Sequence, residues 1–171
     1  TGASGGVGSA LVQLANRRGA ISIAMCSPEK TESVMAIGPA AVPERNPIDL
    51  RSALRQATGL DTVDVVADIV GGRLWPQLID VIARGGRYTC AGAIAGPMVE
   101  FDLRTFYLND LTFTGTTVEP PEVIQTFVEY IERGELNPLL ALSYPLSRFH
   151  EAQQTFIDKQ HVGNIVVCPG S

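Results

Sequence analysis

Apolar residues along the chain follow two alternating patterns. Short apolar runs rich in β-branched residues predict buried strands, and such runs lie at 20–26, 63–70, 87–91, 111–118 and 165–167, with a shorter piece at 40–42 and an extended piece at 139–144. Apolar residues spaced three or four apart predict helices, which lie at 7–18, 28–37, 48–57, 74–82, 101–109, 121–131 and 149–157. Such alternation is typical of an α/β domain with a doubly wound, mostly parallel sheet and helices on both faces.

Three details of this pattern predict how individual helices begin and end. Ser27, followed by Pro28, is expected to cap the helix at 28–37. Gly85 and Gly86 are expected to close the helix at 74–82, because glycine commonly follows the last turn of a helix. Ser147 is expected to cap the helix at 149–157.

Small residues dominate the first eight positions, which read Thr-Gly-Ala-Ser-Gly-Gly-Val-Gly. Glycine lets the backbone adopt positive φ and approach a ligand closely. The turn precedes a predicted helix, whose N-terminus presents free N–H groups and the positive end of the helix dipole, so a pyrophosphate is the expected occupant. The expected contacts are Ser4, Gly5, Gly6, Val7 and Gly8.

An ordinary tight turn would show the same glycines. The strand predicted at 20–26 favours the binding interpretation, because turn, helix and strand together form most of a Rossmann dinucleotide-binding unit. A turn of this kind follows a strand, so we expect Thr1 to be an internal residue of a longer chain, with its first strand and an N-terminal domain upstream.

Composition narrows the classes of function. The 171 residues carry 13 Lys and Arg against 18 Asp and Glu, a net charge of −5, which argues against a nucleic-acid or anionic membrane partner. No apolar run reaches the ~18 residues of a membrane span. Cys26, Cys90 and Cys168 lie far apart, so neither a disulfide framework nor a zinc cluster is expected, and a reducing cytoplasm fits best.

Several motifs occur in the order that one enzyme superfamily has them. They are Gly2 to Ser9 with Val12 to Ala15, Ser27 to Lys30, Val63 to Asp68 with Gly71 and Gly72, Gly85 to Tyr88 with Gly92, Tyr144 to Leu146, Glu151 with Ala152, and Gly163 to Val167. Together they resemble the C-terminal cofactor-binding domain of the medium-chain dehydrogenase/reductase superfamily, in its quinone oxidoreductase-like and zinc-type alcohol dehydrogenase-like branches. Asn164 departs from the pattern, because those proteins usually carry Lys there.

The resemblance implies an NAD(P)-dependent oxidoreductase in which a substrate domain precedes this one. Rossmann domains specific for NAD place an acidic residue about 20 residues beyond the glycines, but here the place is held by Met25, Cys26 and Ser27. The resemblance puts Lys30 at a position that contacts the 2′-phosphate of NADPH, and Arg45 near a second contact on the adenine side. NADPH is therefore expected as the cofactor, ahead of NADH.

The nicotinamide end is expected at the carboxyl ends of two further strands, where ligands of open α/β sheets bind. The candidate residues are Ile69, Val70, Gly92, Ala93 and Ile94. We assign no catalytic residue. Asp64 and Asp68 share one face of a strand, and we interpret both as structural.

Other enzyme classes fit poorly. No tyrosine is followed four positions later by the lysine that short-chain dehydrogenases need, and Gly8, Ser9 and Ala10 lack the lysine of an NTPase phosphate loop. His150 and His161 have no partner at metal-ligand spacing, so we expect no zinc to be bound by this segment.

The expected function is hydride transfer between a nicotinamide and a carbonyl, quinone or enone substrate. The alternatives are a non-catalytic NADP(H) sensor or interaction module, and an enoyl reductase module of a multienzyme chain. The resemblance also implies a homodimer through the edge strand at 111–118.

Overall fold

The computed structural model describes residues 1–45 and 47–170. Its helices are α1 (Gly6–Arg17), α2 (Thr31–Met35), α3 (Leu50–Thr58), α4 (Trp75–Asp80), α5 (Leu103–Leu108), α6 (Pro121–Glu132) and α7 (Phe149–Asp158), with single 3-10 turns at η1 (Pro28–Lys30), η2 (Gly72–Leu74) and η3 (Leu146–Arg148). Its strands are β1 (Val63–Asp68), β2 (Ile82–Cys90), β3 (Thr112–Gly115), β4 (Leu140–Pro145) and β5 (Asn164–Cys168). Asn46, which lies between the strand piece expected at 40–42 and the helix expected at 48–57, is outside the described residues.

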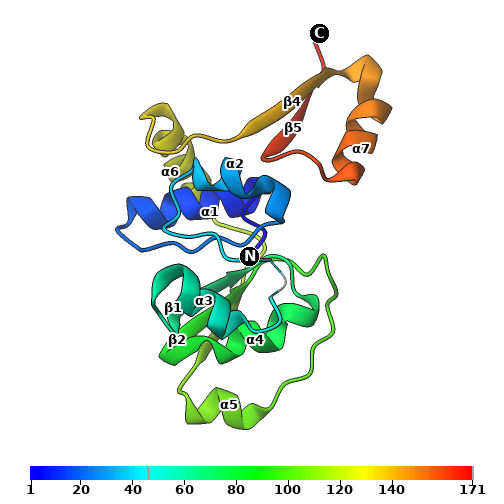
Figure 1. Ribbon diagram of the computed structural model, residues 1–171. Coiled ribbons are helices and arrows are strands. Elements are labelled where there is room, and N and C mark those ends of the chain that lie inside the picture. Colours follow the sequence, from blue (N-terminus) through cyan, green and yellow to red (C-terminus); the bar gives the residue numbers. More distant parts are fainter. Residues whose placement is uncertain (46, 171) are drawn as a thin grey trace.

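Parallel strand pairing organises the described chain into two sheets. The first has the order β1-β2-β3, and the second consists of β4 and β5 (Figure 1). In the first sheet Val66 is paired with Tyr88, which in turn is paired with Phe113. From β1 onward helices and parallel strands alternate along the chain, so the expected α/β class is confirmed.

The strands expected at 20–26 and 40–42 are reduced to isolated bridges. Ile23 is paired with Ala41, and Cys26 is paired with Glu44. The other edge of the segment at 20–26 faces a cavity of about 520 Å³, and β1 lines the opposite side. The segment therefore has a strand partner on one edge only.

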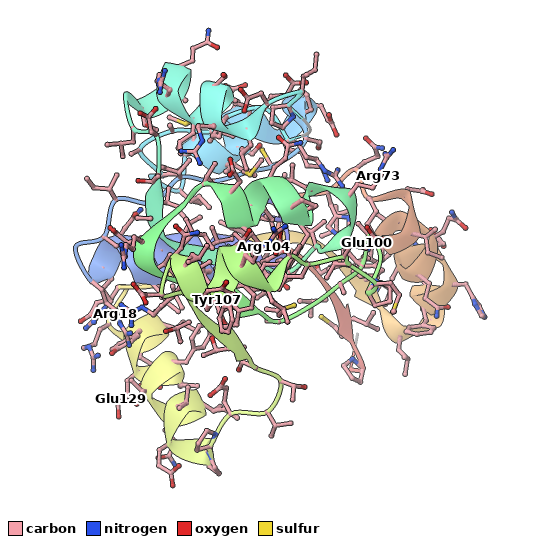
Figure 2. The ribbon with its side chains drawn as sticks, turned by 90° about the horizontal axis from the view of Figure 1, so that it is seen from below. Arg18, Arg73, Glu100, Arg104, Tyr107 and Glu129 are labelled. Atoms are coloured by element: carbon pink, nitrogen blue, oxygen red, sulfur yellow. The ribbon has the colours of Figure 1, made fainter. Side chains whose placement is uncertain are left out.

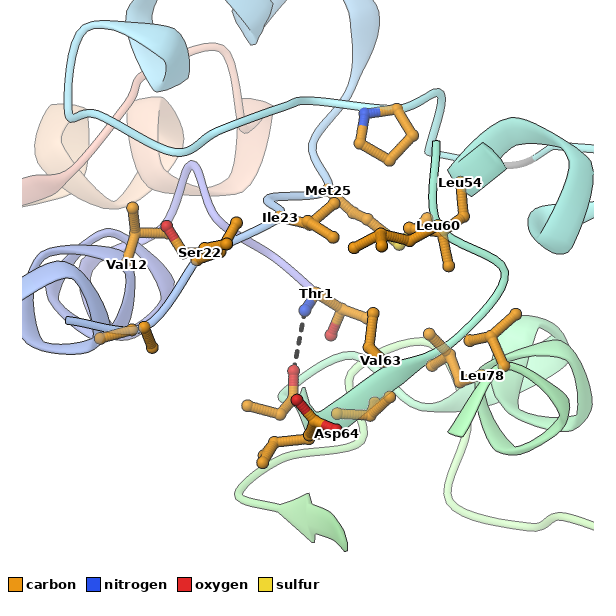
Figure 3. A pocket seen from close by; sticks show the side chains of 18 of the residues that line it. Thr1, Val12, Ser22, Ile23, Met25, Leu54, Leu60, Val63, Asp64 and Leu78 are labelled. Carbon is orange, nitrogen blue, oxygen red and sulfur yellow. Dashed lines mark hydrogen bonds between the residues drawn. The ribbon is translucent and has the colours of Figure 1, made fainter. Parts of the chain in front are cut away.

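Two contacts of the first residues cross this cavity. The Thr1 nitrogen donates to the Ala67 oxygen at 2.8 Å (Figure 3). Ala3 N donates to Met25 O at 3.0 Å. Residues 1–3 thus make ladder-type hydrogen bonds to both walls. The rest of the cavity is lined mainly by apolar side chains, among them Ile23, Leu54 and Val63.

The expected helix boundaries were wrong at two places, and one expected cap lacks its hydrogen bond. Gly85 and Gly86 lie inside β2, where the register shifts between Val63 and Val65, so the positive φ of Gly85 (76°) serves a bulge and not a helix end. Ser27 does occupy the N-cap position before Pro28, but its hydroxyl donates to Glu29 and makes no capping hydrogen bond. Ser147 lies within η3, and α7 begins only after Arg148.

The largest core surrounds Trp75 at the start of α4. Its ring meets those of Tyr88, Phe101 and Phe113 edge-on, with centroids 6.0, 5.0 and 6.3 Å away. These rings join α4 to β2 and β3, and edge-to-face packing of this kind is favourable beyond the area it buries. A smaller cluster, which includes Ala3, Val12 and Val34, packs α1 against the segment at 20–26.

Charged side chains are spread over the outside of the molecule. In Figure 2 the labelled arginines lie far apart, with Arg18 after α1, Arg73 in η2 and Arg104 on α5. Arg104 is paired with Asp102 at 2.6 Å. None of the described helices is long and apolar enough to cross a membrane.

Candidate functional site

The glycine-rich loop folds into a tight turn directly before α1. Gly2 has φ of +64°, and Gly5 N donates to Gly2 O at 3.0 Å. A side chain at Gly8 would place its Cβ 2.2 Å from the same carbonyl oxygen, so only glycine fits there. The spacing of glycines in the sequence therefore reflects a close approach of two backbone segments.

The N-terminus of α1 has the features of an anion site. Gly5 precedes the helix in extended conformation, and no side chain caps the first turn. The Ser9 N–H donates to Gly5 O at 2.9 Å, and the Ser9 hydroxyl donates to Gly6 O at 3.1 Å. Both bonds end on carbonyl oxygens, so they leave the N–H groups of the first turn unused. Such a set of backbone donors, with no capping side chain and at the positive end of the helix dipole, fits a pyrophosphate.

The start of the C-terminal strand lies against one side of the glycine-rich loop, a contact that we did not predict from the sequence. Gly163 N donates to Ser4 O at 2.8 Å, and Gly5 forms a bridge with Gly163. The Asn164 side-chain oxygen lies 2.2 Å from where a Cβ of Gly6 would stand. The only hint in the sequence was that Asn164 replaces the usual lysine.

Asp68, at the end of β1, fixes the next loop. Its carboxylate accepts hydrogen bonds from Val70 N at 2.9 Å and from Gly71 N at 3.1 and 3.2 Å. Ile69 and Val70 are thereby held against the glycine-rich loop, because a Cβ at Gly2 would lie 2.8 Å from Ile69 Cγ1. The candidate residues Ile69 and Val70 therefore lie directly beside the glycine-rich loop.

The loop at 92–96 packs on the loop after β1. Ala95 N donates to Val70 O at 2.8 Å, and Gly72 N donates to Gly96 O at 3.1 Å. A Cβ at Gly92 would stand 2.8 Å from Ile69 O. The candidates Gly92 and Ala93 therefore lie beside Ile69 and Val70, as expected from neighbouring strand ends, while Ile94 is exposed.

Lys30 has a different environment from the one its sequence position suggested. It is only 8% exposed, and its ammonium donates to the carbonyl oxygen of Lys159, just after α7. Arg45 is exposed and lies close enough to Glu29 to lower the pKa of that carboxyl, which is lowered chiefly by the hydrogen bond from Ser27. Arg45 is therefore the freer cation on this side of the site.

His161 adds a titratable group near Lys30. Burial is the main cause that lowers the pKa of His161, and the charges of Lys30 and Lys159 lower it further. Its Nδ1 atom is buried without a hydrogen-bond partner. The ring lies beside that of Phe156, tilted by 33°, with centroids 5.8 Å apart.

The protein-family comparison matches residues 6–133 to a family described as zinc-binding dehydrogenase. The chain belongs to this family. The match agrees with the resemblance to the medium-chain dehydrogenase/reductase superfamily, which is thereby confirmed.

Individual relatives of the chain extend the comparison. The crotonyl-CoA reductase of Streptomyces collinus is 25% identical over 98% of the chain and 42% of that protein. A crystal structure of a protein from Sinorhizobium meliloti 1021, assigned as an alcohol dehydrogenase, superimposes with a TM-score of 0.92 at 48% identity, covering 97% of this chain and 46% of that one. The 2-octenoyl-CoA carboxylase reductase CinF, solved with NADP and 2-octenoyl-CoA, gives 0.89 at 26% identity, covering 98% and 42%. The chain spans less than half of each.

Across residues 1–45 and 47–170, no three His, Cys, Asp or Glu side chains gather where they could hold a metal ion. Asp64 is exposed near the start of β1, and Asp68 is buried at its end, so the two do not form an acid/base pair. Nothing in this segment is assigned a catalytic role.

Proposed function

We propose that the chain is the NADPH-binding domain of an oxidoreductase that moves hydride between the nicotinamide and a carbonyl, quinone or enone. The observation that supports this most strongly is the uncapped N-terminus of α1, where the backbones of Gly2 and Gly8 approach each other closely. NADPH would supply the hydride. The presence of NADP and an unsaturated acyl-CoA in the CinF structure supports both the cofactor and an enone-type substrate.

The chain's own share in this function is binding and positioning. The N–H groups of Gly6, Val7 and Gly8 would hold the pyrophosphate, with Ser4 and Gly5 shaping the turn. The loops after β1 and β2, which carry Ile69, Val70, Gly92, Ala93 and Ile94, would flank the nicotinamide. Their apolar side chains would exclude water from one face of the ring.

Discrimination between NADPH and NADH is proposed to rest on Arg45. No carboxylate is present at Met25, Cys26 or Ser27, where NAD-specific domains carry one. Arg45 is exposed beside this strand end, whereas the ammonium of Lys30 already bonds a backbone carbonyl. Lys30 would then act mainly by fixing the wall of the site and by its charge.

Calorimetric titration of the chain with NADPH, NADP⁺, NADH and NAD⁺ at fixed salt tests this proposal. We expect NADP(H) to bind about tenfold more tightly, or ~1.4 kcal/mol, and Arg45→Ala to remove that preference. Arg84→Ala is the matched control, because Arg84 is an exposed arginine on β2 paired with Asp110. Equal losses for NADPH and NADH in Arg45→Ala would contradict the assignment of Arg45.

Glu29 provides a second check on the nucleotide. The charge of Arg45 contributes to the lowered pKa of the Glu29 carboxyl, and an acidic residue here could instead bond a ribose hydroxyl of NADH. Under the NADPH proposal Glu29→Gln leaves NADH binding unchanged and strengthens NADPH binding slightly. A loss of NADH affinity alone in this variant would favour an NAD site.

The remaining proposals concern the rest of the protein. We propose that the cavity between the segment at 20–26 and β1 takes an apolar strand of the same polypeptide, since residues 1–3 already pair with both walls. A substrate domain would complete the site. An enoyl reductase module and a nucleotide sensor stay as alternatives, which an assay of NADPH oxidation by the whole protein with crotonyl-CoA and a quinone distinguishes.

Assembly and location complete the proposal. A homodimer would form through the edge of β3 within 111–118, and sedimentation of the purified protein would measure it. The wide spacing of the cysteines in the sequence fits a cytoplasmic location, which cell fractionation would test.

A further inference from the structure

The carboxylate of Asp68 is the centre of a buried hydrogen-bond network. Asp68 is only 1% exposed, and besides the two backbone N–H groups of the following loop it accepts from the Tyr88 hydroxyl at 2.9 Å and from the Thr1 hydroxyl at 2.5 Å. Burial by itself would raise the pKa of Asp68, but these hydrogen bonds hold the pKa below its ordinary value. A buried carboxylate with this many donors is fixed in place.

Thr1 connects the network to the glycine-rich loop. Its hydroxyl donates to Asp68 and at the same time accepts from Ile69 N at 3.1 Å. Its nitrogen bonds Ala67 O at 2.8 Å, so Thr1 is held to β1 by three hydrogen bonds. Thr1 directly precedes Gly2, whose backbone packs on Ile69 and Val70.

Two loops that approach each other are therefore fastened at one carboxylate. On one side Asp68 orders the Ile69–Gly71 turn, and through Val70 this turn supports the loop at 92–96. On the other side the Thr1 hydroxyl ties in the turn that precedes α1. A dinucleotide that contacts both loops has to match the distance between them. If that distance is already fixed, binding costs less entropy for ordering the loops.

We infer that Thr1 and Asp68 form a positioning pair that sets the spacing between the glycine-rich loop and the loop after β1, and so couples the two ends of a bound dinucleotide. The inference rests on the proposed function. Neither residue touches the reacting atoms. Their effect is on ligands that bridge both loops and not on ligands that reach one of them.

Isosteric substitution of Thr1 tests this pair in the full chain. Thr1→Val removes the hydroxyl and keeps the shape, and Thr1→Ser keeps the hydroxyl. Tyr88→Phe removes a hydrogen bond to the other oxygen of the same carboxylate, Oδ2 in place of Oδ1. Calorimetry measures the affinity of each variant for NADPH, which spans both loops, and for adenosine 2′,5′-bisphosphate, which has no nicotinamide end. Thermal unfolding of each variant is recorded in parallel.

We expect Thr1→Val to bind NADPH about tenfold more weakly, a size typical of coupling between two sites, with the affinity for adenosine 2′,5′-bisphosphate unchanged. Thr1→Ser should restore NADPH binding, and Tyr88→Phe should lower the unfolding temperature without changing either affinity. Equal losses for both ligands in Thr1→Val, or unchanged NADPH binding, would show that the network is structural only and overturn the inference. If the parent chain binds neither ligand, the proposed function itself fails and the inference falls with it.

Discussion

The two sheets of this chain bury their apolar residues to very different extents. Around Trp75 the aromatic side chains of β2 and β3 pack on α4, and Trp75, Leu78 and Ile79 are almost fully buried. In the region formed by β4, β5 and α7, by contrast, Phe156 is 53% exposed and Ile157 66% exposed. The packing energy is therefore concentrated in the first region. The exposed apolar surface of the second is of the kind that marks a contact with another domain or protein.

Removal of the central aromatic ring should have the largest effect. Trp75→Ala leaves a cavity among Tyr88, Phe101 and Phe113, and we expect it to lower the free energy of unfolding by about 3–5 kcal/mol. Urea unfolding monitored by far-UV circular dichroism measures the change. A loss below about 1 kcal/mol, the size typical of a surface substitution, would mean that the two regions do not differ as described.

The buried carboxylate of the first region and an exposed carboxylate of the second should respond differently to acid. Because the pKa of Asp68 is lower in the folded protein than in the unfolded chain, its contribution to stability is present above about pH 4, its unfolded pKa, and is lost as the pH falls through the folded value. Asp68→Asn should cost about 1–3 kcal/mol at neutral pH, as for hydrogen bonds to a buried charge. The cost should shrink as the pH falls.

Glu151 is the matched control for this pH dependence. Its pKa is also lowered, by the hydrogen bond from Arg148, but both side chains are more than half exposed. Solvent and salt screen such pairs, so Glu151→Gln should leave the stability curve nearly unchanged from pH 7 to pH 3. A pH-dependent loss as large as that of Asp68→Asn would contradict the contrast between the two regions.

Much of the fold followed from local sequence patterns, because strand and helix periods are local. The strand run at 63–70 and the helix spacing at 121–131 each correspond to an element of the structure, β1 and α6. Gly85 and Gly86 were misplaced because positive φ serves a helix end and a bulge equally well. Pairing with β1 decides between the two, and that pairing is not visible in local spacing.

The part of the candidate site that could be predicted from the sequence is the part formed by residues at the ends of neighbouring strands. Ile69 and Gly92 were expected near each other for that reason, and they are. The contact of Gly163 and Asn164 with the glycine-rich loop was missed, since it joins residues more than 150 positions apart. The environment of Lys30 was also missed, because its partner is a backbone carbonyl at Lys159 that no sequence motif marks.

The smallest effect is expected in the second region. In Phe156→Ala the ring lost is half exposed and contacts Lys159, whose ammonium lies 3.5 Å from the ring centroid, and His161. Exposed cation–π contacts contribute about 0.5–1 kcal/mol, so the free energy of unfolding should fall by no more than that when measured as for Trp75→Ala. If Phe156→Ala instead matches Trp75→Ala, the second region has a core of its own and its exposed face is not available to a further domain. A small loss of unfolding free energy in Phe156→Ala, combined with weaker association between this region and a further domain in the whole protein, would locate the contact between them on α7.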